Sequence, residues 1–140
     1  MNDLPAILDD PRTAPGGNDA ARAAQSCVTR QRLQEFARLP TGWAGDRTIP
    51  PRRETLAGID RLLDDLPKAI ALPHASASGD GEIGLTWYRN SDRFSATASP
   101  EGHLVWVSKI GDEYHDGGIL MLASPSFEPF LKALADFFRE

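Results

Sequence analysis

Residues 83–107 read IGLTWYRNSDRFSATASPEGHLVWV, and this stretch decides the fold. Apolar and polar residues alternate in three runs, which are separated by the turn-forming segments Asn90–Asp92 and Ser99–Gly102. Alternation with a period of two indicates strands that bury one face. Serine, proline and glycine at the first, second and fourth positions of residues 99–102 are typical of a type I turn. Strands joined by short turns pair antiparallel, so the stretch predicts an antiparallel meander.

Weaker signals extend this sheet on both sides. Before the meander, Ile70 and Leu72 predict a short edge strand, and Ser76–Gly81 is rich in turn residues. After it, the polar segment Asp112–Gly118 predicts a hairpin loop, and Ile119–Leu122 predicts a further strand. The sheet is therefore expected to have four or five strands.

Two helices are predicted before the sheet. Asn18 or Asp19 can cap the first, because a short side chain with an oxygen accepts hydrogen bonds from the first amides of a helix. The alanine-rich stretch that follows extends to Leu39, where a proline ends it. The second helix begins near Pro50 and runs to about Leu66. Its apolar residues share one face of a 3.6-residue period: Leu56, Ile59, Leu62, Leu63 and Leu66.

The C-terminal helix carries the clearest apolar stripe in the chain. Its members recur at helical spacing and include four of the six phenylalanines: Phe127, Phe130, Leu131, Leu134, Phe137 and Phe138. Such a stripe must be buried, most simply against one face of the sheet. The sequence therefore predicts an α+β fold with two N-terminal helices, an antiparallel sheet, and an amphipathic C-terminal helix packed on that sheet.

Length and composition place this architecture in a single domain. The chain has 140 residues, of which 41% are hydrophobic and 25% are charged, close to the average of globular proteins. Residues 1–17 contain three prolines, two adjacent glycines and three aspartates, and they bury too little apolar area to offset their ordering entropy. We expect a flexible tail there, with a short ordered piece at Leu4–Leu8, and one α+β domain over residues 18–140.

Several function classes are disfavoured by composition. The single cysteine, Cys27, makes neither an internal disulfide nor a thiolate zinc cage. The net charge of −5 disfavours direct nucleic-acid binding, which needs cations to neutralise phosphates. The longest apolar run, Gly118–Ala123, is too short to span a bilayer, and the first residues lack the features of a secretory signal. We therefore expect a cytoplasmic protein that uses no cofactor and binds no membrane.

His115 is the one weak candidate for catalysis. Acidic residues surround it in the segment 111–118, namely Asp112, Glu113 and Asp116, and they could help it to bind a cation. The other histidines lack the ligand spacing of a metal motif, so no metal site is predicted. A small hydrolase or metal-assisted enzyme that uses the His115 loop is an alternative function, and a solvated loop is the alternative without function.

Trp43 and three arginines form the first candidate group for partner binding. Trp43 stands in a glycine-flanked loop, and Arg47, Arg52 and Arg53 follow it. Exposed tryptophan and arginine are enriched in interaction hot spots. The alternatives are a Trp43 that folds over the two helices and arginines that are only solvated.

An acidic surface forms the second candidate group. Residues 67–140 hold six basic and ten acidic residues, so this half carries most of the excess negative charge. Within it, Asp112, Glu113 and Asp116 could attract a basic partner surface, with steering that weakens in salt.

The chain resembles a loose group of small uncharacterised bacterial proteins over residues 33–110. The shared pattern is a Leu-Pro followed by a Trp-x-Gly loop, here residues 39–45 (LPTGWAG), then a helix, then a Gly-Glu-Ile…Trp hairpin strand, here residues 81–87 (GEIGLTW). The chain departs from this pattern at Ala44, where an aspartate is usual, and at Thr86, where an acid is usual. Members look like accessory genes of bacteria and mobile elements. The resemblance therefore implies a binding or regulatory role and assigns no active-site residue.

The leading hypothesis is a non-enzymatic protein-binding module. It would act by stoichiometric binding or occlusion of a partner, as an antitoxin, an immunity protein or a phage-borne, anti-CRISPR-like inhibitor of a host defence complex does. The His115 enzyme is the first alternative, and a structural subunit of a larger assembly is the second. Self-association is compatible with each of them.

Overall fold

The computed structural model describes residues 19–139, without the side chains of residues 19–23, 25, 26 and 116. The predictions for the tail at residues 1–17, for Leu4–Leu8 and for the Asn18 cap lie outside the described residues. In chain order, the described elements are α2 (Asp19–Phe36), α3 (Arg53–Asp64), β1 (His74–Ala77), β2 (Ile83–Arg89), β3 (Asp92–Ala98), β4 (His103–Ile110), β5 (Glu113–Met121) and α4 (Glu128–Arg139).

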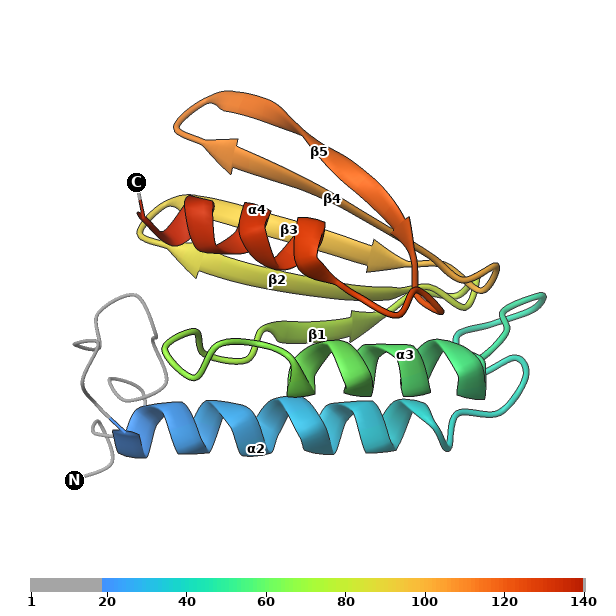
Figure 1. Ribbon diagram of the computed structural model, residues 1–140. Coiled ribbons are helices and arrows are strands. Elements are labelled where there is room, and N and C mark those ends of the chain that lie inside the picture. Colours follow the sequence, from blue (N-terminus) through green and yellow to red (C-terminus); the bar gives the residue numbers. More distant parts are fainter. Residues whose placement is uncertain (1–18, 140) are drawn as a thin grey trace.

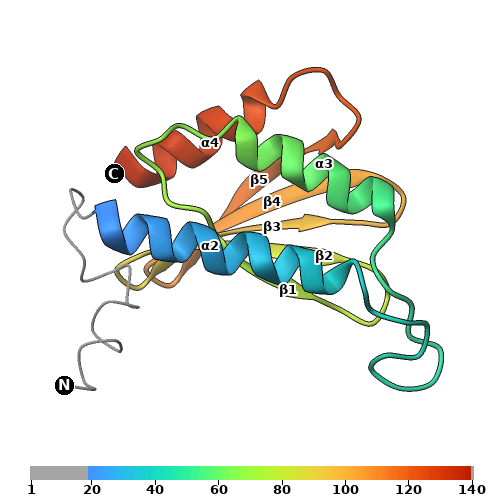
Figure 2. The same ribbon diagram turned by 90° about the horizontal axis from the view of Figure 1, so that it is seen from below.

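The five strands form one antiparallel sheet in the order β1-β2-β3-β4-β5, so each strand pairs with the next along the chain. This arrangement confirms the predicted α+β class and the meander. Figures 1 and 2 show α2, α3 and α4 on the same side of the sheet. We call the side beneath the helices the inner face and the opposite side the open face.

The inner face is built from the alternate apolar residues of the predicted strands. Its buried members on the three central strands are Ile83, Leu85, Trp87, Phe94, Ala96, Ala98, Leu104 and Trp106. The register keeps them in rows, because Ala96 lies opposite both Leu85 and Trp106. The residues between them point to the open face, since successive side chains of a strand alternate.

Phe130 of α4 lies at the centre of the core. Its fully buried ring has its centroid 5.8 Å from that of Trp87, 5.6 Å from that of Phe94 and 5.3 Å from that of Trp106. Phe137, two turns later, lies 5.7 Å from Phe94. Tilted and edge-on rings at these distances attract each other beyond the burial of their area. The C-terminal helix therefore packs on the sheet as predicted.

The helices α2 and α3 cover the inner face on the side of β1 (Figure 1). The buried hydroxyl of Thr29 donates to the carbonyl of Pro73 at 2.6 Å, which fixes α2 beside the start of β1. Arg30 pairs with Asp60 and Asp64 of α3 at 3.1 and 2.8 Å, which joins the two helices. Across residues 19–139, none of the helices has the length and apolar character that a membrane span requires.

The expected edge strand at Ile70 and Leu72 is wrong, because β1 comprises His74–Ala77 instead. The backbone N–H of Ile70 closes a turn on the carbonyl of Pro67 at 3.0 Å, and Leu72 packs partly buried against the core. Of the β1 side chains only Ala75 is buried, so this strand carries a weak apolar signal. Its pairing with β2, rather than its own sequence, determines where it lies.

The loop predicted at Asp112–Gly118 is also wrong, since β5 already begins at Glu113. A shift in the register of β4 between Trp106 and Ser108 marks a β-bulge in this pair of strands. At the bulge, a Cβ atom on Gly117 would overlap the backbone carbonyl of Trp106. The polar, glycine-containing sequence is therefore that of a bulged edge strand.

Gly117→Ala tests the bulge. The new Cβ would meet backbone atoms that cannot rotate away, so we expect the free energy of unfolding to fall by about 3 kcal/mol. Gly84→Ala in β2 is the matched control, because its Cβ meets only the hydroxyl of Ser76, at 2.8 Å, and that side chain can rotate. Urea unfolding measures both variants, and equal stabilities would contradict the close approach at Gly117.

Candidate functional site

The open face carries most of the exposed apolar side chains. Eight large hydrophobic residues are exposed within the described part of the chain, and six of them lie on this face: Tyr88, Val105, Val107, Tyr114, Ile119 and Met121. We call these six the apolar strip. Tyr114 is 64% exposed and Ile119 is 63% exposed, although both belong to a strand. Contiguous apolar surface of this kind marks interaction sites.

The strand register arranges the open-face side chains in rows that cross the sheet. One row has two cations between two tyrosines, with one residue from each of β2, β3, β4 and β5: Tyr88, Arg93, Lys109 and Tyr114. We call it the cation row. A second row, further along the strands, contains Thr97, Val105 and Ile119. The cation row therefore places charge between two members of the apolar strip, whereas the second row carries no charged side chain.

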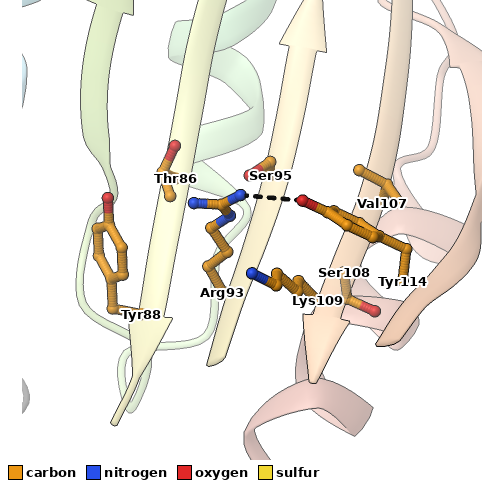
Figure 3. Close-up of a pocket in the computed structure, with 8 residues that line it drawn as sticks. All are labelled: Thr86, Tyr88, Arg93, Ser95, Val107, Ser108, Lys109 and Tyr114. Atoms are coloured by element: carbon orange, nitrogen blue, oxygen red, sulfur yellow. Dashed lines mark hydrogen bonds between the residues drawn. The ribbon is translucent and has the colours of Figure 1, made fainter. Parts of the chain in front are cut away.

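A pocket of about 220 Å³ opens at the cation row (Figure 3). Eight side chains from β2 to β5 line it: Thr86, Tyr88, Arg93, Ser95, Val107, Ser108, Lys109 and Tyr114. Arg93 Nη2 donates to the Tyr114 hydroxyl at 3.3 Å, and Lys109 Nζ lies 5.6 Å from the centroid of the Tyr114 ring. Two of these described lining residues are cations, five carry hydroxyl groups and none is acidic. The pocket is therefore electropositive and rich in hydrogen-bond donors.

Asp92 ties together the turns at this end of the sheet. Its Oδ1 accepts from the backbone N–H of Gly111 at 2.9 Å, and its Oδ2 accepts from Arg89 at 3.0 Å. Arg89 also donates to the carbonyl of Phe137 in α4 at 2.6 Å. The Gly111 amide and the Arg89 guanidinium hold the pKa of Asp92 below its ordinary value. These contacts join the end of β2 and the start of β3, next to Arg93, to the β4–β5 turn and to α4.

His115 lies on β5 and lines a second pocket, of about 230 Å³, between the sheet and α4. Ser108 lies opposite it on β4, and Asp136 of α4 lines the same pocket. Within residues 19–139, however, no hydrogen bond links these three side chains, and Asp136 pairs with Arg139 at 3.1 Å. A serine nucleophile is activated by a base within hydrogen-bond reach, and the described residues show no such bond between Ser108 and His115. The described residues also contain no group of three side chains that could hold a metal ion.

The loop between α2 and α3, to which Trp43 and Arg47 belong, lies at the opposite end of the sheet from the β2–β3 and β4–β5 turns (Figure 1). Trp43 is half-buried and donates from Nε1 to the carbonyl of Ile49 at 3.0 Å, so it closes its own loop. The N–H of Ile49 in turn donates to the carbonyl of Gly79 at 2.8 Å, which fixes the loop to the β1–β2 turn. The three arginines are exposed: Arg47, Arg52 and Arg53.

The acidic candidates lie near the cation row rather than in its pocket. Asp112 and Glu113 are exposed at the β4–β5 turn, next to the Gly111 amide that Asp92 binds. The side chain of Asp116 lies outside the described residues. The two predicted groups therefore lie apart in the structure. The pocket at the cation row, on the open face, is a third candidate site.

No local sequence pattern predicts the cation row. Arg93 and Lys109 are far apart in the chain, and only the β3–β4 register places them opposite each other. A signal was present, because both stand at positions that alternate with the buried residues of the predicted meander. Pairing the strands outward from the Ser99–Gly102 turn would have brought the two cations together.

Comparisons with protein-family models, with curated proteins and with solved structures find no significant match to this chain. The resemblance to a bacterial group therefore stays a prediction. The geometry of the open face is the basis for the function proposed below.

Asp92→Asn tests the contact that holds this end of the sheet. Because folding lowers the pKa of Asp92, its contribution to stability is present above the unfolded pKa of about 4 and is lost as the pH falls through the lower, folded pKa. We expect a lower melting temperature than wild type at pH 7, and a difference that shrinks towards pH 2.

Asp112→Asn is the control for this measurement, because its carboxylate makes no hydrogen bond within the described residues. We expect it to melt like wild type at pH 7. If the difference between Asp92→Asn and wild type were the same at every pH, the role of the Asp92 carboxylate would be refuted.

Proposed function

We propose that this protein is a stoichiometric protein-binding module whose partner docks on the open face of the sheet. The supporting observation is the apolar strip, since six large side chains are exposed on one face while the described helices cover the other. Burying one such side chain contributes about 1.5–3 kcal/mol. A partner that buries the apolar strip would therefore form a stable complex without a change in the fold.

A partner of a different kind suits this face better than a second copy. Arg93 and Lys109 lie on it, and none of the described residues that line their pocket is acidic. A second copy laid face to face would add two more cations to this pocket and no carboxylate from the same residues. Like charges across an interface cost affinity. We therefore propose a partner with an apolar surface flanked by acidic side chains.

Docking of this kind acts by occlusion, and the chain needs to supply only a rigid surface. The open face has that property, because β3 and β4 are paired on both sides and Phe130 holds α4 beneath them. Antitoxins, immunity proteins and inhibitors of defence complexes cover a functional surface of their targets in this way. We place the protein in this broad class, with the partner's identity to be determined by capture.

The double variant Val105→Ser/Ile119→Ser tests the open face. The two residues lie opposite each other on β4 and β5 and are exposed, so we expect their replacement to leave the fold intact. We expect affinity for a protein co-purified from the source organism to fall at least tenfold, or about 1.4 kcal/mol, by isothermal titration calorimetry. Val28→Ser is the matched control, because Val28 is exposed to a similar degree but lies on α2.

Three results would contradict the proposal. Loss of binding in Arg52→Glu/Arg53→Glu, with none in the open-face variant, would place the partner at the arginine group near Trp43. If the wild-type protein sediments as a dimer and the open-face variant as a monomer, the occupant of the open face is a second copy. Absence of any stoichiometric partner would remove the binding function itself.

A further inference from the structure

We infer that the pocket in the cation row is a carboxylate-binding site that takes an aspartate or glutamate side chain from an acidic segment of the partner. This inference rests on the proposed function and adds the chemistry that the partner must present. A chain with a net charge of −5 places two cations side by side on its open face, at Arg93 and Lys109. Such a local reversal of charge favours an anionic ligand.

In the part of the chain that the structure describes, both cations have N–H donors that no hydrogen bond or ion pair uses. Within the described residues neither Arg93 nor Lys109 forms an ion pair, although other arginines of the chain do. The guanidinium of Arg93 has five N–H donors in a planar fork, and among residues 19–139 it makes one hydrogen bond, to the Tyr114 hydroxyl at 3.3 Å. That distance is long for a hydrogen bond. An incoming carboxylate can therefore bind the fork bidentately without breaking a strong contact.

The walls of the pocket suit one side chain. Its volume of about 220 Å³ is below the 300–1,000 Å³ that is typical of small-molecule sites. Val107 and the rings of Tyr88 and Tyr114 bound it, and hydroxyl groups complete its lining. Arg93, Tyr88 and Tyr114 are exposed, so a carboxylate can reach the two cations from solvent. The pocket thus fits the end of a protein side chain.

The location of this pocket on strands favours a carboxylate over a phosphate. Phosphate sites in proteins commonly use free backbone N–H groups, at helix N-termini or in glycine-rich loops. The residues of this pocket lie on strands, and not at a helix N-terminus or in a glycine-rich loop. The donors that line the pocket are therefore side chains, namely Arg93, Lys109 and hydroxyl groups. A planar carboxylate matches the planar fork of Arg93.

The rows of the open face also restrict the spacing within the partner. Along β3, Arg93 of the cation row is four residues from Thr97, which shares a row with Val105 and Ile119. Four residues of a strand span about 13 Å. An extended partner segment would therefore carry its acidic residue four positions from the apolar residue that contacts Val105 and Ile119.

Titration of the ¹⁵N-labelled full chain with an end-blocked hexaglutamate peptide tests the site. We expect the largest amide shift changes at Tyr88, Arg93, Lys109 and Tyr114, and weaker binding as salt is added. Arg93→Gln/Lys109→Gln should weaken peptide binding at least fivefold. Arg38→Gln/Lys132→Gln is the matched control, because it makes the same change in charge at exposed residues outside the open face, and we expect less than a twofold effect.

Two results would overturn the carboxylate site. One is equal loss of binding in the two double variants, which would show attraction to net charge alone. The other is displacement of the peptide from these amides by inorganic phosphate at equal ionic strength, which would make a phosphorylated segment the ligand.

The same titration separates the two proposals. If hexaglutamate fails to bind while partner binding still depends on Val105 and Ile119, only the carboxylate site is wrong. If hexaglutamate binds at the cation row in a protein that has no partner on its open face, the proposed function is wrong and the site stands.

Discussion

The packing of Phe130 against Trp87, Phe94 and Trp106 is the contact on which the rest of the structure depends. These three rings share the inner face because strands alternate their side chains, and Phe130 brings α4 to that face. Loss of a buried phenylalanine costs about 3–5 kcal/mol, a large share of the stability of a small domain. Since α2 and α3 lie on the same side, no helix within residues 19–139 covers the opposite face (Figure 2).

The open face is therefore a direct product of the core. The alternation that buries Phe94 turns Arg93 outward, and the alternation that buries Trp106 exposes Val105 and Val107. Because β3 and β4 are paired on both sides, their backbone is engaged, and a partner meets their side chains on a rigid sheet. Rigid side-chain surfaces of this kind suit recognition, since little conformational entropy is lost when they bind.

The sequence predicts the parts of the fold that carry strong local periodicity. The stripe from Phe127 to Phe138 and the alternation in residues 83–107 were sufficient for the helix, the meander and its inner face. β1 and β5 were misplaced, because their positions depend on pairing: Ala75 is the only buried side chain of β1, and a bulge interrupts β5. The cation row was not predicted for the same reason, because the register of the strands, and not a sequence motif, brings its residues together.

The claim that a partner covers the open face is tested most directly by oxidative footprinting of the captured complex. Tyrosine and methionine side chains report their own exposure, and Tyr88, Tyr114 and Met121 all belong to the apolar strip, whereas the exposed Cys27 lies on α2. We predict that oxidation of the three strip residues falls severalfold in the complex while that of Cys27 is unchanged. Protection of Cys27 with the strip still fully oxidised would contradict it.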